Sequence, residues 1–557
     1  SEPEVYARES AAARAAAHRF NAGLGVEPFE ELMDRFASRP TVAIGAIPEP
    51  ASEQAGDLAA LTPEQRALLM LRLRKKAAGK PAAEGGTPAI PRAPRDPCDP
   101  EGGDLPLSFA QQRLWFLDQW EPGNPAYNIP AAVRLSGPLD AAAFAATLRE
   151  IVRRHEALRT AFPEMDGRPA QRIALAVDLV VPLIDLAALP AARRETETVR
   201  LARADAARSF DLARGPLLRT ALLRLAAGEH VALVAMHHIV SDGWSIGVLI
   251  AEVAAIYGAF RAGRPHGLPE LPIQYADFAV WQRGWLQGDE LEKQLGSWRE
   301  RLAGMPPVLE LPADRRRTAV HGFRGGLCPI ELDPALWAGV RAFSRGQGAT
   351  PFMTALAAFL ALVRRLTGQT DLAVGTPIAN RNRAETEGLI GFFVNTLVLR
   401  VEVSADRSPE PGLRDLLARV REATLGAYAH QDLPFEEVVK AVAADRDRSH
   451  NPLFQVMFAL HSLPATPPPI PGLELSFLEL HAGTAKFDFD FMGLERNGTL
   501  TGGVEHNADL FDSTTVGRYV DCWMTLLGAA LAAPDLPLTE LPIQYADFAV
   551  WQRGWLQ

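Results

Sequence analysis

The sequence predicts an α/β protein. An apolar run from His230 to Ala235 is typical of a buried strand, and Ile246 to Phe260 carries apolar residues at helical spacing directly after it. Further along, Phe487–Leu494 and Gly502–Asn507 alternate like antiparallel strands. A length of 557 residues predicts two to four domains, and 48% hydrophobic with 22% charged residues is typical of a globular protein with a large core.

Composition argues against several classes of function. The net charge is −10 and no basic block is present, so we expect no nucleic-acid partner. Cys98, Cys328 and Cys522 lie far apart without metal or redox spacing, which suits a reducing cytoplasm. No apolar run approaches the roughly 20 residues that cross a bilayer, so we expect no membrane partner. The chain begins at Ser1 without a signal-peptide pattern and reads as a fragment of a longer protein.

The first hundred residues precede the compact part. Residues 1–60 are expected to be the tail of an upstream domain or a docking element, and 61–103 a helix followed by a flexible linker. The helix is predicted from Thr62 to about Lys76, because Thr62 is a favourable N-cap and Pro63 suits the first helical position. Many Pro and Gly residues make 77–103 a flexible tether.

The compact part begins near Leu105 and alternates helices with strands. Ser108 caps an amphipathic helix, and a second helix runs from Asp140 to His155. The predicted strands of this half are Tyr127–Leu135, Pro216–Leu225 and Val231–Met236. A second half starts near Trp298, with a helix at Pro351–Leu366, a strand at Asp371–Gly375 and a loop at Arg381–Arg383.

The end of the chain holds an internal repeat. Glu540–Gln557 repeats Glu270–Gln287 without one difference over 18 residues. Diverged repeats do not stay identical while their flanks differ, so we interpret the second copy as a recent duplication or assembly accident without function. It follows the last expected element and is predicted to have nothing to pack against.

Two adjacent histidines stand where the strand ends and the helix begins, in the stretch Ala235-Met-His-His-Ile-Val-Ser-Asp-Gly-Trp-Ser245. Neighbouring side chains on a strand point to opposite faces, so His237 and His238 cannot both serve one metal site. We expect one histidine to face a cleft and the other the interior.

His-His-x-x-x-Asp-Gly after a strand resembles the active-site motif of the condensation domains of nonribosomal peptide synthetases, relatives of chloramphenicol acetyltransferase. Six further stretches resemble the other condensation motifs and stand in family order: 108–115 (SFAQQRLW), 154–160 (RHEALRT), 275–282 (YADFAVWQ), 390–396 (IGFFVNT), 430–435 (HQDLPF) and 448–455 (RSHNPLFQ).

The resemblance implies a fold of two chloramphenicol acetyltransferase-like sandwich subdomains in a V-shaped pseudo-dimer with a central tunnel. We place the N-terminal subdomain at 104–275 and the C-terminal subdomain at 276–539. The first motif and the Asp-Gly-Trp-Ser after the histidines resemble the subtype that joins two L-configured residues, called LCL, or one that accepts an acyl donor.

The implied reaction is amide bond formation between a carrier-bound acyl or aminoacyl thioester donor and a carrier-bound aminoacyl acceptor. His238 is then the essential histidine, as general base or as a positioning group, and the Gly243 N–H is an oxyanion donor. His237 is structural.

Asp242 is structural in either of two ways. It could simply cap the following helix. The resemblance implies a buried salt bridge, for which Arg159 is the first choice of partner and Arg383 the second. Trp244, Ser245 and Asn395 are expected along the tunnel.

No nucleotide, metal or phosphopantetheine-attachment motif is visible, so no bound cofactor and no metal are expected. The resemblance implies that substrates arrive on phosphopantetheine arms of donor and acceptor carrier domains in adjacent synthetase modules, from opposite faces. Two rival interpretations remain. One is a catalytically idle domain that recruits a tailoring enzyme, and the other is an epimerisation domain, which shares the His-His motif.

Overall fold

The computed structural model describes residues 89–543 apart from 96–103, 121, 124, 320–321, 323, 404–409, 444–448, 463–469, 471, 479–484 and 497. The tail predicted at 1–60, the helix predicted at Thr62–Lys76 and residues 544–557 of the repeat lie outside the described residues.

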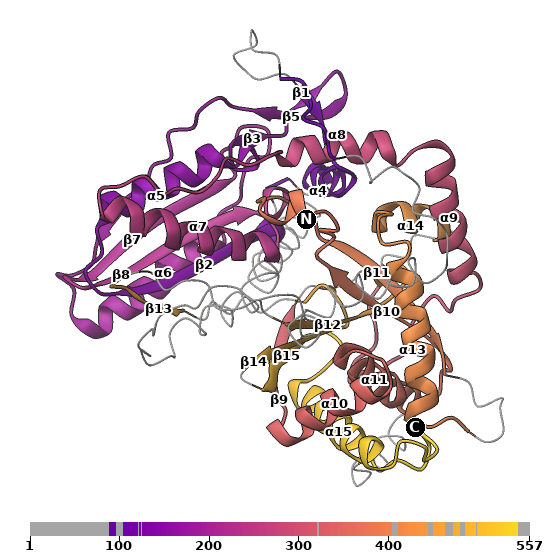
Figure 1. The fold of residues 1–557 in the computed structure, drawn as a ribbon. Helices are drawn as coiled ribbons and strands as arrows, with labels where there is room; N and C mark the ends of the chain where they lie inside the picture. The colour runs from indigo at the N-terminus through magenta and orange to yellow at the C-terminus, as the bar shows by residue number, and fades with distance from the viewer. Residues whose placement is uncertain are drawn as a thin grey trace, which may run out of the picture.

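The N-terminal lobe is built on a five-stranded sheet (Figure 1). Its strand order is β13 (Glu474–Phe477), β2 (Asn128–Ser136), β8 (Glu229–His237), β7 (Leu218–Ala226) and β6 (Leu183–Asp185). Helices α5 (Ala141–Arg154) and α7 (Gly243–Arg261) pack with one face in the large core of this lobe, and α6 (Ala191–Ala206) covers a smaller cluster on the other face. Apolar residues on both faces explain why β8 reads as a continuous apolar run.

The C-terminal lobe holds a six-stranded mixed sheet. Its order is β11 (Asn395–Glu402), β10 (Asp371–Ile378), β12 (Val456–Ser462), β14 (Phe489–Arg496), β15 (Thr499–Asn507) and β9 (Gly325–Glu331). The helices of this core are α10 (Pro334–Gly346), α11 (Pro351–Thr367), α13 (Leu413–Tyr428) and α15 (Ser513–Ala532).

The remaining elements of the described residues lie outside these two large sheets and their core helices. The helices are α4 (Phe109–Trp120), α8 (Tyr275–Trp285), α9 (Gly288–Leu302), α12 (Ala384–Glu387) and α14 (Phe435–Val442). The 3-10 turns are η2 (Pro125–Tyr127), η3 (Glu156–Arg159) and η4 (His238–Val240). A small separate sheet contains β1 (Asp104–Pro106), β3 (Thr160–Ala161), β4 (Glu164–Met165) and β5 (Arg168–Ile173). The helices and strands that we predicted within the described residues are confirmed, with ends displaced by a few residues.

The two lobes exchange segments. Strand β13 falls in the range predicted for the C-terminal subdomain but pairs antiparallel with β2. Helix α8 lies across the predicted boundary at 275/276: Tyr275 and Phe278 belong to the N-terminal core, whereas Leu286 just after it belongs to the C-terminal core. Each lobe therefore contains segments from the other half of the chain. These shared segments hold the two lobes in a fixed arrangement.

The start of the second repeat copy has a packing role. Leu541 is 2% exposed and Ile543 is 6% exposed in the C-terminal core. The Arg365 guanidinium donates to the carbonyl oxygens of Leu538, Thr539 and Leu541 at 2.9–3.1 Å. Our prediction that this copy has nothing to pack against is wrong for its first residues, which continue the fold before the identical sequence ends.

Helix α7 is the one helix among the described residues that is long and apolar enough on its own to cross a membrane, and half of it is buried inside the protein. Helices α10 and α11 meet that criterion only when counted together across a 106° bend. The burial of α7 matches its place as a core helix of the N-terminal lobe.

Candidate active site

His238 lies directly after β8, at the first position of η4. Its Nδ1 is 2.8 Å from the carbonyl oxygen of Ser241. A carbonyl oxygen can only accept, so Nδ1 carries the proton and Nε2 keeps its lone pair. The Phe392 ring, from the other lobe, meets the imidazole edge-on with centroids 4.8 Å apart.

His238 is neutral near pH 7. Burial lowers its pKa, and the nearby charge of Lys486 lowers it further, to about 4, against the opposing effect of Asp242. The result is a half-buried histidine with a fixed tautomer, whose second nitrogen forms no hydrogen bond with the residues that the structure describes. Such a group can accept a hydrogen bond from an amine.

His237 occupies a different environment. It is 3% exposed, lies 6.4 Å from the Tyr127 ring and 6.2 Å from the Phe210 ring, and accepts the N–H of Ile239 at Nδ1. Burial lowers its pKa to about 3. His237 therefore lies in the interior, as expected for one of the two histidines.

Asp242 ties the two lobes together. It is 1% exposed and caps α7 by accepting the N–H of Ser245 at 2.8 Å. Its other oxygen accepts the N–H of Phe393 at 2.8 Å, and the Arg381 guanidinium lies 3.2 Å from the carboxylate. Asp242 is thus both the helix cap and the salt-bridge partner, the two roles left open from the sequence.

The predicted salt-bridge partners are wrong. Arg159 lies 3.6 Å from Glu156 and donates to the carbonyl of Ala174. Arg383 lies 3.7 Å from Glu385 and stacks on Trp281. Arg381 is instead the buried arginine that pairs with Asp242. Its guanidinium also lies over the Phe393 ring, 4.1 Å from the centroid, and donates to carbonyl oxygens of its own loop.

A loop of the C-terminal half, residues 389–394, crosses into the N-terminal core; we call it the crossing loop. Ser245 Oγ donates to the Gly391 carbonyl at 2.9 Å and accepts the Gly391 N–H at 3.0 Å. The Tyr275 hydroxyl donates to the Phe392 carbonyl at 2.6 Å. A Cβ at Gly391 would lie 2.1 Å from the Tyr275 ring, so this position requires glycine. These contacts hold Phe392 against His238.

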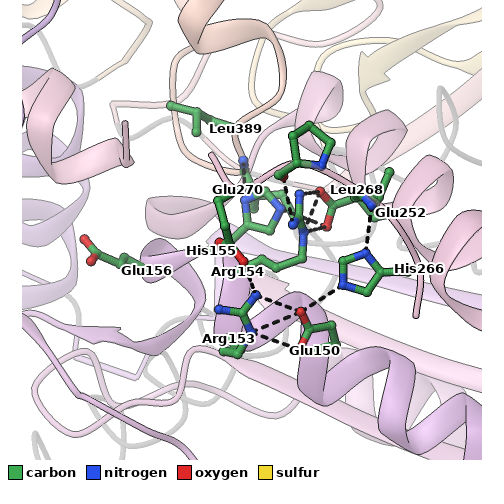
Figure 2. Close-up of polar contacts among 12 residues, drawn as sticks. Glu150, Arg153, Arg154, His155, Glu156, Glu252, His266, Leu268, Glu270 and Leu389 are labelled. Atoms are coloured by element: carbon green, nitrogen blue, oxygen red, sulfur yellow. Dashed lines mark hydrogen bonds and ion pairs between the residues drawn. The ribbon is translucent and has the colours of Figure 1, made fainter. Parts of the chain in front are cut away.

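A buried polar cluster connects the crossing loop to helices α5 and α7 (Figure 2). His155, after α5, accepts the N–H of Ile390 at Nδ1, so its protonated Nε2 donates to Glu252 of α7 at 3.1 Å. Arg154 grips the same carboxylate at 3.0–3.1 Å. Since one carboxylate holds both side chains, α5, α7 and the crossing loop form one connected unit.

The three residues predicted along the tunnel differ in how exposed they are. Trp244 is 37% exposed and donates its indole N–H to the Glu387 carbonyl. Ser245 has no exposed surface, and its Oγ contacts Asp242, Arg381 and Gly391 of the crossing loop. Asn395 is 8% exposed, and its amide bonds the carbonyls of Gln431 and Leu433. Ser245 and Asn395 are therefore buried in contacts within the protein, and their place along a tunnel stays a prediction.

Gly243 is the first residue of α7 and is exposed. A Cβ built there meets no atom within 4 Å, and its backbone angle is not in the left-handed region. The turn alone does not demand glycine, because another residue would fit the backbone. Helix α7 begins at Gly243, five residues after His238, so the positive end of the helix dipole lies at Gly243.

Sequence reasoning missed three residues that make contacts between the two halves of the chain. Phe392 contacts His238, the Lys486 Nζ lies 5.7 Å from the Tyr127 ring centroid, and Arg113 of α4 bridges to Glu436 of α14 at 3.0 Å. Phe392 lies inside a stretch that resembled a family motif, which is a signal that could have found it. The other two are brought near by long-range pairing alone.

Within the described residues no group of three or more His, Cys, Asp or Glu side chains could hold a metal ion. Neither Cys328 nor Cys522 forms a disulfide within the described residues.

A family model described as Condensation domain matches residues 101–554. The chain belongs to the condensation-domain family. It is thus related to the condensation domains of nonribosomal peptide synthetases, and the resemblance drawn from the sequence is confirmed.

Curated relatives of this condensation domain are much longer. The chain is 48% identical over 441 residues to one of the linear gramicidin synthase proteins of Brevibacillus parabrevis, covering 79% of this chain and 9% of that protein. It is 44% identical over 502 residues to phosphinothricin tripeptide synthetase PhsC of Streptomyces viridochromogenes, covering 88% of this chain and 44% of that protein. The chain therefore spans less than half the length of these relatives.

Solved structures share the fold. The X-domain from teicoplanin biosynthesis superposes with a TM-score of 0.70 at 30% identity, covering 82% of this chain and all of that chain. The first condensation domain of the calcium-dependent antibiotic synthetase gives a TM-score of 0.65 at 21% identity, covering 80% of this chain and 99% of that chain. The predicted chloramphenicol acetyltransferase-like fold is confirmed.

Proposed function

We propose that this condensation domain catalyses thioester aminolysis: it joins a carrier-bound acyl or aminoacyl donor to a carrier-bound aminoacyl acceptor. The observation that carries the proposal is His238, whose protonated Nδ1 is fixed on Ser241 while Nε2 forms no hydrogen bond within the described ranges. An interior histidine with both nitrogens satisfied could not do this.

The acceptor amine attacks the donor thioester carbonyl, and a C–N bond forms as the carbonyl oxygen becomes an oxyanion. Collapse of this intermediate breaks the C–S bond and expels the pantetheine thiolate. The proton lost by the amine ends on the thiolate sulfur, directly or through Nε2 of His238. No oxidant, metal or bound cofactor enters the balance.

The proposed role of His238 is to position the attacking amine and not to remove its proton completely. A pKa of about 4 makes Nε2 a weak base, and general base catalysis works best when the pKa is close to the working pH. A fixed lone pair still orients the N–H of the attacking amine, and holding two tethered substrates in attack geometry supplies much of the acceleration.

The start of α7 suits the oxyanion. Free N–H groups at a helix N-terminus and the helix dipole stabilise developing negative charge. Gly243 is exposed there, so a thioester can approach its backbone closely. Gly243 N–H is the proposed donor.

The proposed partners are donor and acceptor carrier domains whose phosphopantetheine arms reach His238 from opposite faces of the junction. Adjacent synthetase modules supply them, in the cytoplasm. The LCL subtype is part of the proposal and rests on the sequence motifs.

A recruitment domain is the second candidate, because a solved complex of the X-domain and OxyB from teicoplanin biosynthesis has the same fold at 30% identity. The experiment uses the chain with donor and acceptor carriers loaded with aminoacyl groups, and mass spectrometry of the acceptor carrier. We expect the amide product on the acceptor. Carriers left unchanged would favour recruitment, and an inverted stereocentre without an amide would favour epimerisation.

A further inference from the structure

Residues 89–95 (Ala-Ile-Pro-Arg-Ala-Pro-Arg) contain no helix or strand and lie in a stretch that the sequence predicts to be a flexible tether. We call this segment the strap. Ile90 is 3% exposed and Ala93 is 9% exposed, whereas both prolines and Arg92 are exposed. Burial at a spacing of three residues is typical of a polyproline II segment. Each buried residue precedes a proline, which disfavours a helical backbone at that residue, so the sequence itself favours an extended strap.

The first half of the strap is fastened at two points. Ile90 belongs to the apolar core of the N-terminal lobe, and its N–H donates to Glu385 of α12 at 3.4 Å. The Arg92 guanidinium donates to the carbonyl oxygens of Leu271 and Pro272 at 2.7 and 2.8 Å. Those two carbonyls belong to the loop that leads into α8. One planar guanidinium can reach both because its N–H donors have a fixed geometry.

Two carboxylates receive the second half of the strap. The Ala93 N–H donates to Oδ1 of Asp277, in the first turn of α8, at 2.9 Å, and the Arg95 guanidinium lies 3.0 Å from the same oxygen. Arg95 also donates to Glu156 at 2.8 Å. Glu156 points away from the polar cluster around Glu252 (Figure 2). We call these two carboxylates and the two carbonyls of the preceding loop the strap site.

Asp277 depends on the strap more than Glu156 does. Asp277 is 1% exposed, and within the described residues its Oδ1 is bonded by the strap alone, while Oδ2 accepts the Gln274 N–H at 2.8 Å. Glu156 has a second cation, because Arg159 lies 3.6 Å from it. A buried carboxylate is costly unless it is paired and hydrogen-bonded. The burial of Asp277 is therefore favourable only with the strap in place.

We propose that the strap site is a binding site for an extended segment that carries proline and arginine, and that its occupant is the chain's own strap. Docking fixes the point at which the chain before residue 89 leaves the domain. It also gives a role to Glu156 and Asp277, which lie in stretches that resemble condensation motifs but take no part in the proposed chemistry. The inference does not depend on the proposed function.

Two physical arguments favour this occupant. The prolines limit the conformations of the free strap, so less conformational freedom is lost when it docks. The strap is also joined to β1 at Asp104 through residues 96–103 only, and so short a connection gives it a high effective concentration at the site. A separate peptide of the same sequence lacks that advantage.

Limited digestion of the full chain with trypsin tests docking. The bond between Arg92 and Ala93 is a trypsin site, and its N–H is the one bound by Asp277. We expect this bond to be cleaved at least about tenfold more slowly than the same bond in a synthetic peptide of residues 87–97, with mass spectrometry to identify the cut. Equal rates in the chain and in the peptide would overturn the inference, and this comparison needs no variant.

The double variant Ile90→Ala/Arg95→Ala should raise the cleavage rate at least about tenfold, because it removes the apolar anchor and the ion pairs but keeps the trypsin site. Arg200→Ala is the control, because Arg200 is an exposed arginine that pairs with Glu197 within α6 at 2.6 Å. Cleavage of the double variant at the wild-type rate would contradict the assigned contacts.

Binding of the labelled peptide of residues 87–97 tests the strap site itself. The double variant should bind the peptide saturably, whereas the wild-type chain should bind it at least about tenfold more weakly because its own strap competes. A peptide with Gln in place of Arg92 and Arg95 should also bind the double variant at least about tenfold more weakly. Equal binding of the two peptides, or no binding of either to a double variant with wild-type melting behaviour, would overturn the inference.

Discussion

Asp242 is the residue on which the junction between the lobes depends most. One carboxylate accepts from the Ser245 N–H in the first turn of α7, from the Phe393 N–H of the crossing loop and from Arg381. Asp242→Ala should reduce the free energy of unfolding by about 3–5 kcal/mol, because Arg381 would stay buried without its charge partner. Denaturant unfolding measures this. The double variant Asp242→Ala/Arg381→Met should recover part of the loss, and a wild-type midpoint for Asp242→Ala would show that the pair is not needed.

The burial of His237 predicts how the free energy of unfolding depends on pH. Its pKa falls from 6.5 in the unfolded chain to about 3 in the folded one, chiefly through burial. The unfolded state therefore takes up the proton first, so this stabilisation is complete above pH 6.5 and is lost as the pH falls toward 3. By pH 4.5 the loss should reach about 3 kcal/mol.

His237→Gln should flatten the dependence of the unfolding free energy on pH between 6.5 and 4.5, since it removes that proton-binding site. The comparison is between slopes, so a general loss of stability in the variant does not obscure it. Equal slopes for the variant and the wild type would contradict a neutral buried His237.

At the scale of single elements, substitutions at the N-terminus of α7 distinguish a glycine required by the backbone turn from a glycine required for substrate passage. Open space around Gly243 means that Gly243→Ala should fold and condense normally. Gly243→Trp should also fold, because the position is exposed, but should lose amide formation as its indole blocks one pantetheine arm.

The readouts for this pair are melting temperature and single-turnover amide formation. A stable Gly243→Trp protein that condenses at the normal rate would exclude passage beside Gly243. Loss of folding in Gly243→Ala would instead mean that the turn requires glycine.

The helices and strands were predictable because their apolar patterns are local, as the continuous run of β8 and the helical spacing of α7 illustrate. His238 was predictable from its motif. Arg381 was not, since it lies 139 positions from Asp242 and only the path of its loop decides which of two nearby arginines turns inward. The deep burial of Ser245 and Asn395 was not predictable for a similar reason: a motif gives proximity to the site, but burial depends on the opposing lobe.

At the scale of the molecule, two lobes share chain through β13 and the crossing loop, and the C-terminal lobe closes with the first residues of the repeat. Deleting 544–557 should leave activity unchanged, because the first copy already forms α8. Deleting 541–557 should lower the melting temperature, since Leu541 and Ile543 leave the core, and loss of a buried Leu side chain alone costs about 2–5 kcal/mol.

Thermal melts of both truncations, with Leu541→Ala as a point-variant control, check this. Identical melting of the two truncations would mean that Leu541 and Ile543 add nothing to the core. A strong loss of rate on deleting 544–557 would mean that the second copy has a function after all.

The measurement that tests the central claim most directly is single-turnover amide formation by His238→Asn with loaded donor and acceptor carriers. The asparagine amide can still donate to the Ser241 carbonyl, so the fold should hold, but nothing replaces Nε2. We predict a rate loss of about 10²–10⁴-fold with wild-type melting behaviour. Amide formation at the wild-type rate would contradict the assignment of His238 as the catalytic residue.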